Sequence, residues 1–494
     1  MESTHTSELV VALCGPIGSP LHTVGNLIKK VLERDYQYVC NIVRLSQIIE
    51  RFKGNAPESS RFDRIKYLID KGNELRREYG SSILADLAVA EIATDREEQK
   101  DRSGVTSFQP RRVCHIVDSI KNQEELEALR LVYRDMLYFI GVFSPLPSRE
   151  KSLENAGMSL AEVYQLIDRD SGEEIGHGQT VRNTFPQADF FLRIDTDAEQ
   201  LIERKLIRFL NIIFGAEVVT PTSGETAMYL AASAAGSSAC MSRQVGAAIT
   251  DSNGDVIAVG WNDVPKATGG LYQSSADLNS QDDHRCIYKG SGSCSNDVEK
   301  KLISRQIAQE LVDAGFIEEG KIEKASETIR ESKVKDLIEF SRSVHAEMHA
   351  IVLGSQIAGE RVRGGKLFCT TYPCHSCARH ILLAGIKEVY YIEPYRKSLA
   401  IKLHGDAITE VESDTKKVRI LPFDGVAPAR YLELFRMIGD SRKDRSGNMR
   451  RVDRQFAMPK CKVTLESLPA LEGIVVQRLI DKHIIAGNTV DSST

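Results

Sequence analysis

Apolar runs of strand length alternate with helical patterns through the first 220 residues. Residues 9–14, 112–118 and 188–194 are strand candidates, and residues 27–32 continue as a helix after a glycine-containing turn. A longer stretch, residues 201–210, repeats apolar side chains along one helical face. Such alternation of strands and helices predicts a mainly parallel α/β sheet over residues 1–220.

A second run of elements begins near Pro221. Thr222 and Glu225 have capping-box spacing in front of a helix of small residues. Asn253-Gly254 lies between two apolar runs and is typical of a hairpin turn. We therefore predict four strands in this part of the chain, at residues 244–249, 256–261, 366–371 and 388–392.

These patterns divide the chain into three parts. Residues 1–220 form one predicted α/β domain, and residues 221–435 form a second, with a long polar insertion at about 266–341. Residues 436–494 read as a basic C-terminal extension, because six arginines and lysines lie between Arg442 and Arg454. No repeat of fixed period is visible.

Composition narrows the class of protein. The 494 residues are 42% hydrophobic and 27% charged, as in ordinary globular proteins, and the net charge of −5 gives no overall attraction to nucleic acid or anionic membrane. The first residues lack a basic signal region, and no apolar run is long enough to span a membrane. We expect a cytoplasmic protein, in which the ten cysteines bind metal or act chemically more often than they form disulfides.

Two short motifs carry the clearest chemistry. His345-Ala346-Glu347 is followed by Pro373-Cys374-His375-Ser376-Cys377, which is the H-x-E and P-C-x-x-C signature of zinc-dependent nucleobase deaminases. His345, Cys374 and Cys377 supply the three ligands of a catalytic zinc and leave a fourth position for water. Glu347 is then the predicted catalytic proton carrier.

The substrate is indicated by residues around the strand predicted at 256–261. Residues 259–265, Val-Gly-Trp-Asn-Asp-Val-Pro, resemble a strand-end motif of deoxycytidylate deaminases in which an asparagine contacts the sugar. This resemblance makes Asn262 a substrate-binding candidate together with Pro373, although Asn262 could also be an ordinary turn residue. His349 stands where that branch usually has asparagine, and it either supports the metal site or is simply packed.

The polar insertion contains a second group of potential ligands. Several deoxycytidylate deaminases hold a structural zinc in such an insertion, so His284, Cys286 and Cys294 are either three ligands of a second zinc or a polar loop with incidental thiols. A substrate phosphate would need cations near the site. The candidates are Arg285, Lys289, Arg396, Lys397 and His404.

The loop after the first strand has the context of a phosphate-binding P-loop but not its residues. Gly15, Gly18 and Ser19 are the nucleotide-binding candidates, whereas Pro20 and Leu21 stand where the second glycine and the lysine belong. Without that lysine, phosphoryl transfer lacks its main cation, and a domain kept for binding or assembly is favoured over an active ATPase. Asp118 either assists this loop or is an ordinary strand-end carboxylate.

The whole arrangement resembles the bacterial two-domain anti-phage deoxycytidine nucleotide deaminases. The likeness also covers residues 118–122, 391–399 and 422–428, and so spans most of residues 9–435. It implies a P-loop kinase-like parallel sheet followed by a cytidine-deaminase-like α/β/α three-layer domain. It also implies deamination of dCTP and dCMP that depletes the dCTP pool during infection, a homo-oligomer, and inhibition by a small RNA.

Two other functions fit the same residues. The first is deamination of cytosine or adenine within a polynucleotide, with the segment from Arg442 to Arg454 on the phosphate backbone. The second is a nucleotide sensor or assembly scaffold in which the deaminase site is secondary. Free deoxycytidine nucleotides are the substrates that the motifs favour.

Overall fold

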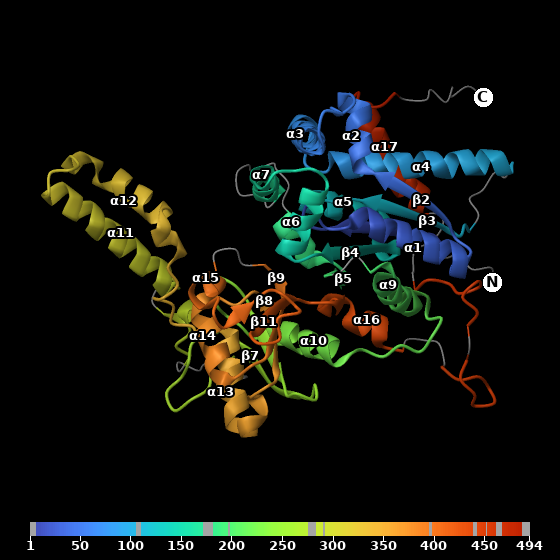
Figure 1. The fold of residues 1–494 in the computed structure, drawn as a ribbon. Helices are drawn as coiled ribbons and strands as arrows, with labels where there is room; N and C mark the ends of the chain where they lie inside the picture. Colours follow the sequence, from blue (N-terminus) through green and yellow to red (C-terminus); the bar gives the residue numbers. More distant parts are fainter. Residues whose placement is uncertain are drawn as a thin grey trace. The chain divides into compact units, whose positions relative to one another are not determined.

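The structure is a computed structural model that describes residues 6–104, 110–170, 181–195, 198–274, 283–289, 292–394, 398–437, 442–450, 452–460 and 467–486 (Figure 1). The chain forms two compact units. One unit comprises Met1–Pro221 with Phe423–Thr494, and the other comprises Thr222–Pro422. The domain limits expected at residues 220 and 435 stay predictions; in the structure, residues just after Pro422 pair with the first unit.

The first unit is built on a six-stranded sheet of order β12-β5-β4-β1-β3-β2. Its neighbouring strands are parallel except for the β12–β5 pair, which confirms the mainly parallel sheet. The hydrophobic pattern did not single out β2, β4 and the two-residue β12. The strands are β1 (Leu9–Cys14), β2 (Val39–Arg44), β3 (Val113–Asp118), β4 (Leu137–Phe143), β5 (Phe190–Arg193) and β12 (Gly425–Val426).

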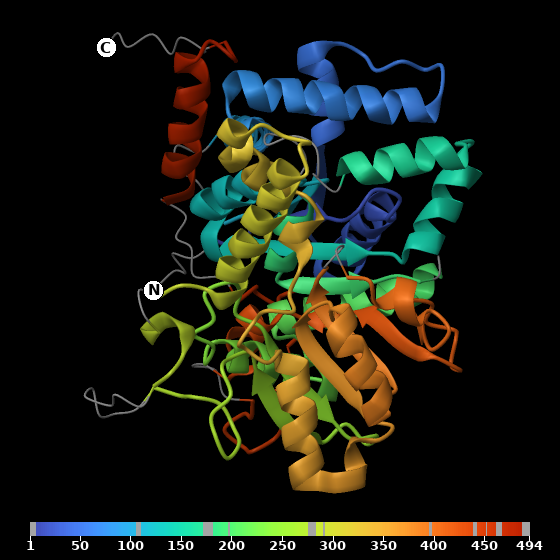
Figure 2. The ribbon, with the colours of Figure 1, turned by 90° about the vertical axis from the view of Figure 1, so that its left-hand side faces the viewer.

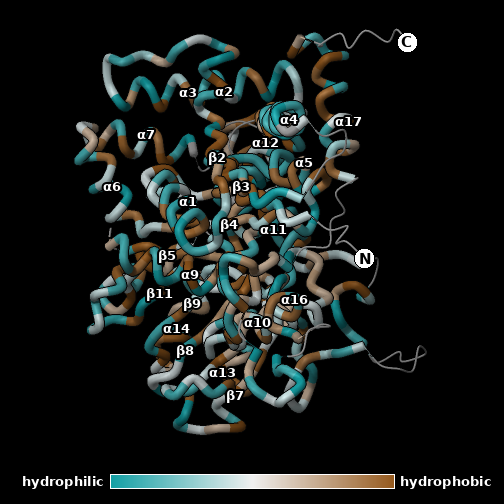
Figure 3. The backbone as a smooth tube through the Cα atoms, turned by 90° about the vertical axis from the view of Figure 1, so that its right-hand side faces the viewer, coloured by the Kyte–Doolittle hydropathy of each residue, from teal (hydrophilic) through white to brown (hydrophobic). Residues whose placement is uncertain are grey.

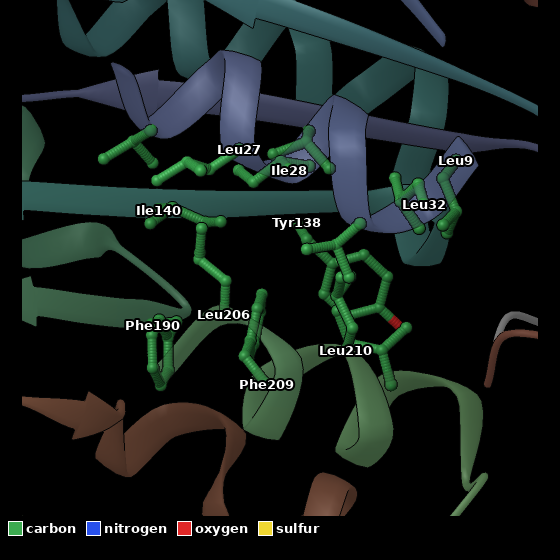
Figure 4. Close-up of a cluster of buried hydrophobic side chains, with 14 of the residues drawn as sticks. Leu9, Leu27, Ile28, Leu32, Tyr138, Ile140, Phe190, Leu206, Phe209 and Leu210 are labelled. Atoms are coloured by element: carbon green, nitrogen blue, oxygen red, sulfur yellow. The ribbon is translucent and has the colours of Figure 1, made fainter. Parts of the chain in front are cut away.

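Helices surround this sheet. They are α1 (Leu21–Tyr36), α2 (Leu45–Lys53), α3 (Arg61–Tyr79), α4 (Ile83–Ser103), α5 (Gln123–Tyr133), α6 (Leu146–Asn155), α7 (Leu160–Asp170), α8 (Val181–Thr184), α9 (Glu199–Phe214), α16 (Tyr431–Phe435) and α17 (Ser467–Asp481). The main core lies between the sheet and helices α1 and α9 (Figure 4). There Phe209 of α9 stacks on Phe190, with ring centroids 4.3 Å apart, and meets Tyr138 edge-on.

A buried charge cluster attaches α17 to the first unit. Arg96 of α4 donates two hydrogen bonds to Glu472 of α17, at 2.8 and 3.0 Å, and a third to Glu8 at 2.6 Å. All three side chains are at most 3% exposed. Arg96 and Arg111 lower the pKa of Glu8 against the opposing effect of burial, whereas burial raises the pKa of Glu472. Elsewhere α17 is largely apolar, as Figure 3 shows.

The second unit has a six-stranded sheet of order β10-β11-β9-β8-β6-β7. The hairpin of β6 and β7 is antiparallel, β6 also pairs antiparallel with β8, and the remaining pairs are parallel. All four strands expected in this part are confirmed. The strands are β6 (Gly246–Thr250), β7 (Val256–Trp261), β8 (Lys366–Thr371), β9 (Glu388–Glu393), β10 (Ile408–Thr409) and β11 (Val418–Pro422).

Two glycines let helices lie directly on this sheet. A Cβ at Gly246 would lie 1.9 Å from the Ala231 carbonyl of α10 (Ser223–Ala235), and one at Gly260 would lie 2.5 Å from the Ala350 amide of α13 (Ala346–Ala358). Because Gly260 pairs with Ala247, the residue next to Gly246, the two contacts are on opposite faces of the sheet. Helices therefore cover both faces, and α13, which carries Glu347, is held against β7.

The second unit has further helices besides α10 and α13. They are α11 (Ser295–Asp313), α12 (Ile322–Glu331), α14 (His375–Ala384) and α15 (Ala400–His404). In the polar insertion, α11 and α12 pair as a hairpin that extends away from the sheet of this unit (Figures 1 and 2). Among the described residues, no helix is both long and apolar enough to cross a membrane.

Candidate active site

Three metal-ligating side chains meet where two helices begin. His345 is the residue before α13, Cys374 is the residue before α14, and Cys377 lies in the first turn of α14. The Nδ1 atom of His345 is 3.2 Å from the Sγ of Cys377 and 3.3 Å from the Sγ of Cys374. The three ligand atoms all lie within 4.8 Å of one another, which makes this cluster a candidate zinc site.

The chemistry of the three side chains fits a divalent ion. Hydrogen bonds from Cys377 and His345 lower the pKa of Cys374 to about 4, and the bond with Cys374 raises the pKa of His345 to about 9. The hydrogen bond with Cys374 and burial raise the pKa of the Cys377 thiol. Two sulfurs and one imidazole are a ligand set that zinc prefers. Among the described residues, this is the one group of three such side chains close enough to share an ion.

Glu347 lies beside the cluster in the wall of a cavity of about 180 Å³. The cavity is also lined by His345 and Cys374, so the ligands and the carboxyl group face one space. Glu347 is 4% exposed, and burial raises its pKa above the usual value. A carboxyl group that holds a proton more readily than usual is suited to passing one to a bound molecule.

Comparison with known proteins agrees with this geometry. Residues 221–393 match the family described as the cytidine and deoxycytidylate deaminase zinc-binding region. The C-terminal half of the chain contains a cytidine/deoxycytidylate deaminase zinc-binding domain. We call it the deaminase domain.

Similar proteins match parts of this chain. ComE operon protein 2 of Bacillus subtilis is 45% identical over 56 residues, which are 11% of this chain and 29% of that protein. The deoxycytidylate deaminase of Enterobacteria phage T4 is 28% identical over 163 residues, or 33% of this chain and 72% of that enzyme. The dCMP deaminase of cyanophage S-TIM5 with dCMP and dUMP matches 42% of this chain and 99% of its own, at 22% identity and a TM-score of 0.24, too low to assign a fold.

The other predicted substrate residues lie close to the cluster. Asn262 lines the cavity and is 7% exposed; its side chain accepts a hydrogen bond from the Val245 amide and donates one to the Arg243 carbonyl. Pro373 is buried directly before Cys374, and its carbonyl accepts a hydrogen bond from Ser398. Asn262 therefore borders the space that a substrate would fill.

The two further histidines of the motifs have other partners. His349 accepts a hydrogen bond from the Trp261 amide at 3.2 Å, and burial lowers its pKa, so the ring is neutral and packed against β7. His375 lies 3.7 Å from Glu339. Among the described residues, neither belongs to the group of potential metal ligands.

The second predicted metal cluster is spread more widely. Cys286 and Cys294 line a small cavity, and Cys240, which the sequence analysis did not select, lines it as well. His284 is exposed and is not among the residues that line this cavity. The second zinc site stays a prediction, with Cys240 a further thiol next to two of its three residues.

The predicted phosphate-binding cations do not line the active-site cavity within the described residues. Arg285 is buried and holds Asp283 through several hydrogen bonds, including one of 2.6 Å. Arg396 and Lys397 lie outside the described residues, and Lys289 and His404 are not among the lining residues. The cation that does line the cavity is Arg243, which sequence reasoning missed although it directly precedes a predicted strand.

The loop after β1, where the sequence predicts a degenerate P-loop, is held by contacts within the first unit. Gly15, Gly18 and Ser19 connect β1 to α1, and Gly18 has a φ of +85° with Arg149 where a Cβ would lie. Lys121 donates a hydrogen bond to the Gly15 carbonyl at 2.7 Å.

Two more side chains form contacts at or beside this loop. His22, the second residue of α1, pairs with Asp118. Arg149 donates to the Ile17 carbonyl at 3.3 Å. Nucleotide binding at Gly15, Gly18 and Ser19 stays a prediction.

The basic extension is exposed over residues 442–450, where Lys443 and Met449 form an isolated antiparallel bridge. Arg454 pairs with Glu217 at 2.7 Å, and Arg451 lies outside the described residues. Part of the predicted backbone-binding charge is therefore used within the first unit.

Proposed function

We propose that this chain hydrolyses the amino group of cytosine in free deoxycytidine nucleotides, converting dCMP to dUMP and dCTP to dUTP with release of ammonia. The observation that carries the proposal is the buried carboxyl group of Glu347 in the cavity that also exposes His345 and Cys374. The match of residues 221–393 to the cytidine and deoxycytidylate deaminase region supports it.

The proposed chemistry divides the work between metal and protein. When bound by His345, Cys374 and Cys377, zinc would lower the pKa of a water molecule and make it nucleophilic at neutral pH. Glu347 takes the proton of the water that attacks C4 of cytosine and delivers it to N3. It then carries the proton of the new C4 hydroxyl group to the amino group, so that the C4–N bond breaks, a C4 carbonyl forms and ammonia leaves.

The remaining residues position the substrate. We propose that Asn262 contacts the sugar. After its two hydrogen bonds to the backbone, Nδ2 still has one N–H and Oδ1 one lone pair for this contact. Pro373 is not among the residues that line the cavity, and it would act on the substrate pocket through its neighbour Cys374. Closing the base off from bulk water strengthens each polar contact in the site.

The test is ammonia release by zinc-loaded protein from dCMP, dCTP, CMP, CTP, deoxycytidine, adenosine and single-stranded DNA. We expect turnover on dCMP and dCTP, and we expect Glu347→Gln to lower kcat at least about 100-fold, the lower range of general acid–base effects, with zinc content unchanged. The exposed Glu299→Gln on α11 is the matched control. Turnover confined to adenosine or DNA, or near-normal rates for Glu347→Gln, would overturn the proposal.

The resemblance to anti-phage deaminases suggests a biological role for the proposed activity. We propose that the activity depletes the dCTP pool during phage infection, that the protein is a homo-oligomer in the cytoplasm, and that a small RNA can inhibit it. The expected result is a fall of cellular dCTP and a rise of deoxyuridine nucleotides after infection, absent in a Glu347→Gln strain. An unchanged pool would contradict this role.

The rival functions make different predictions in the same assays. Deamination within a polynucleotide would require turnover on single-stranded DNA and a strong salt dependence of binding through the exposed residues 442–450. A nucleotide-sensing scaffold built on Gly15, Gly18 and Ser19 would show assembly that depends on ATP and survives Glu347→Gln. Zinc stoichiometry tests the second site: two ions per chain in the intact protein, and one after Cys294→Ser.

A further inference from the structure

An arginine at the rim of the active-site cavity has no part in the proposed reaction. Arg243 lies three residues before β6, is about half exposed, and lines the same cavity as His345 and Glu347. We infer that Arg243 binds the phosphate group of the substrate and that Glu393 limits how much negative charge the site accepts. This inference rests on the proposed deaminase function and specifies how the site distinguishes a nucleotide from a nucleoside.

The charges of the cavity point to Arg243. Among the described residues that line it, Arg243 carries the one permanent positive charge, Glu347 is the acid, and the rest are apolar or neutral polar side chains apart from the predicted metal ligands. Ser242, Ser341 and Ser343 add hydroxyl groups to the lining. A phosphate needs at least one cation and several donors, and a guanidinium with five N–H groups supplies both charge and a fork of hydrogen bonds.

The backbone under Arg243 is fixed by Asn262. The side chain of Asn262 donates to the Arg243 carbonyl at 2.8 Å and accepts from the Val245 amide at 2.7 Å, so both sides of the amide group hold this short segment. Asn262 is 7% exposed and comes directly after β7. It acts as a positioning residue for Arg243, while the guanidinium itself remains at the rim.

Glu393 forms an ion pair with Arg243. Its Oε2 atom is 2.8 Å from Nη2 of Arg243, and the two side chains are 40% and 48% exposed. Glu393 is the last residue of β9, and its carbonyl accepts a hydrogen bond from the Tyr372 amide, which keeps it next to the cavity wall. Exposed ion pairs contribute little to stability, so a phosphate with two negative charges can displace this carboxylate from Arg243.

The Arg243–Glu393 pair therefore determines the preference between dCMP and dCTP as well as the affinity for phosphate. A carboxylate left beside the bound phosphate repels each added negative charge, and it penalises a triphosphate more than a monophosphate. Removing Glu393 should favour dCTP over dCMP, whereas removing Arg243 should weaken both nucleotides and leave deoxycytidine unaffected. These opposite effects distinguish the pair from residues that merely support the fold.

The experiment measures ammonia release from dCMP, dCTP and deoxycytidine by the zinc-loaded protein and its Arg243→Gln and Glu393→Gln variants. Loss of charge-assisted hydrogen bonds to a phosphate corresponds to about a 10- to 100-fold rise in KM for both nucleotides with Arg243→Gln. The kinetics of deoxycytidine should stay unchanged. For Glu393→Gln we expect KM to fall severalfold for dCTP and less for dCMP.

Matched controls separate failure of this inference from failure of the proposed function. Arg305→Gln on α11 removes an exposed, ion-paired arginine of the same unit that does not line the cavity, and it should change none of the constants. If dCMP is deaminated but Arg243→Gln leaves its KM within twofold of wild type, or raises the KM of deoxycytidine equally, the inference is wrong and the function stands.

Binding of dUMP and deoxyuridine, followed by calorimetry, does not depend on turnover. If no cytosine compound is deaminated, yet dUMP binds at least about 10-fold more tightly to wild type than to Arg243→Gln, the phosphate site stands and the proposed function fails. Equal affinity of wild type and Arg243→Gln for dUMP would overturn the inference whatever the activity.

Discussion

Replacing Glu472 should loosen the C-terminal helix from the first unit. Its carboxylate is 1% exposed and accepts two hydrogen bonds from Arg96, and charge-assisted bonds of this kind contribute about 1.5–3 kcal/mol each. Removing one partner of a buried ion pair costs about 3–5 kcal/mol. In Glu472→Leu, Arg96 keeps its bond to Glu8, so we expect a loss near the lower limit, about 3 kcal/mol.

Replacing the other partner of the ion pair, Arg96, should cost more stability. In Arg96→Met, Glu472 loses its arginine, while Glu8 keeps Arg111 at 3.0 Å, so we expect a loss near the upper limit, about 5 kcal/mol. In the double variant Arg96→Met/Glu472→Leu both charges are gone and no buried carboxylate is stranded. Its loss should be smaller than the sum of the two single losses, because the interaction between contacting groups is counted in both.

Urea unfolding measures these losses. Far-ultraviolet circular dichroism follows the helices of both units, and fluorescence follows Trp261, the one tryptophan of the chain, which belongs to the second unit. We expect the dichroism midpoint to move further than the fluorescence midpoint. The exposed Glu98→Leu on the same helix as Arg96 is the control, with a change within about 0.5 kcal/mol. A loss for Glu472→Leu no larger than that control, or additive single losses, would refute the reasoning.

Three further predictions concern the deaminase domain. Gly260→Ala forces a Cβ to 2.5 Å from the Ala350 amide and should displace α13, which we expect to lower zinc content in metal analysis and ammonia release together. Cys374→Ser removes a sulfur ligand and should lower bound zinc by about one ion per chain, measured by plasma mass spectrometry. His349→Gln should make the loss of stability at acid pH less steep. Because burial lowers the pKa of His349, its neutral ring contributes stability above the unfolded-state pKa of 6.5, and this stability is lost as the pH falls below that value. Thermal unfolding between pH 7.5 and 5 checks this.

Two of these predictions have a control substitution on the same chain. Gly320→Ala has no atom within 4 Å of the added Cβ and should leave zinc binding unchanged. Cys40→Ala removes a buried thiol of the first unit and should keep the catalytic zinc. Full zinc retention in Gly260→Ala or Cys374→Ser, or an equally steep acid transition in His349→Gln, would contradict the structural explanation.

The metal cluster could be predicted because its determinants are local in the sequence. Cys374 and Cys377 are three residues apart at the start of one helix, and His345 precedes another helix, so the spacing alone brings each part to a helix N-terminus. The position of Arg243 could not be predicted in this way. It depends on the pairing of β6 with both β7 and β8, and β8 lies more than 100 residues further along the chain.

The missed strands have physical reasons of their own. β2 is only partly buried and contains Asn41 and Arg44, so its apolar pattern is weak. β4 is strongly apolar but follows α5 with only a single 3₁₀ turn between them, and no glycine or proline marks its beginning. The buried contact of Arg96 with Glu472 joins residues 376 positions apart, a distance over which no spacing rule applies.

The order in which the two units lie along the chain has a consequence for synthesis. The first unit receives β12 and α17 from residues after Phe423, so a ribosome makes the whole of Thr222–Pro422 before it makes these elements. The candidate zinc ligands therefore leave the ribosome while Arg96 still lacks Glu472. A translating chain can form its metal centre before the first unit has its last strand and helix, and a message cut short after residue 422 would yield a deaminase domain attached to an unfinished partner.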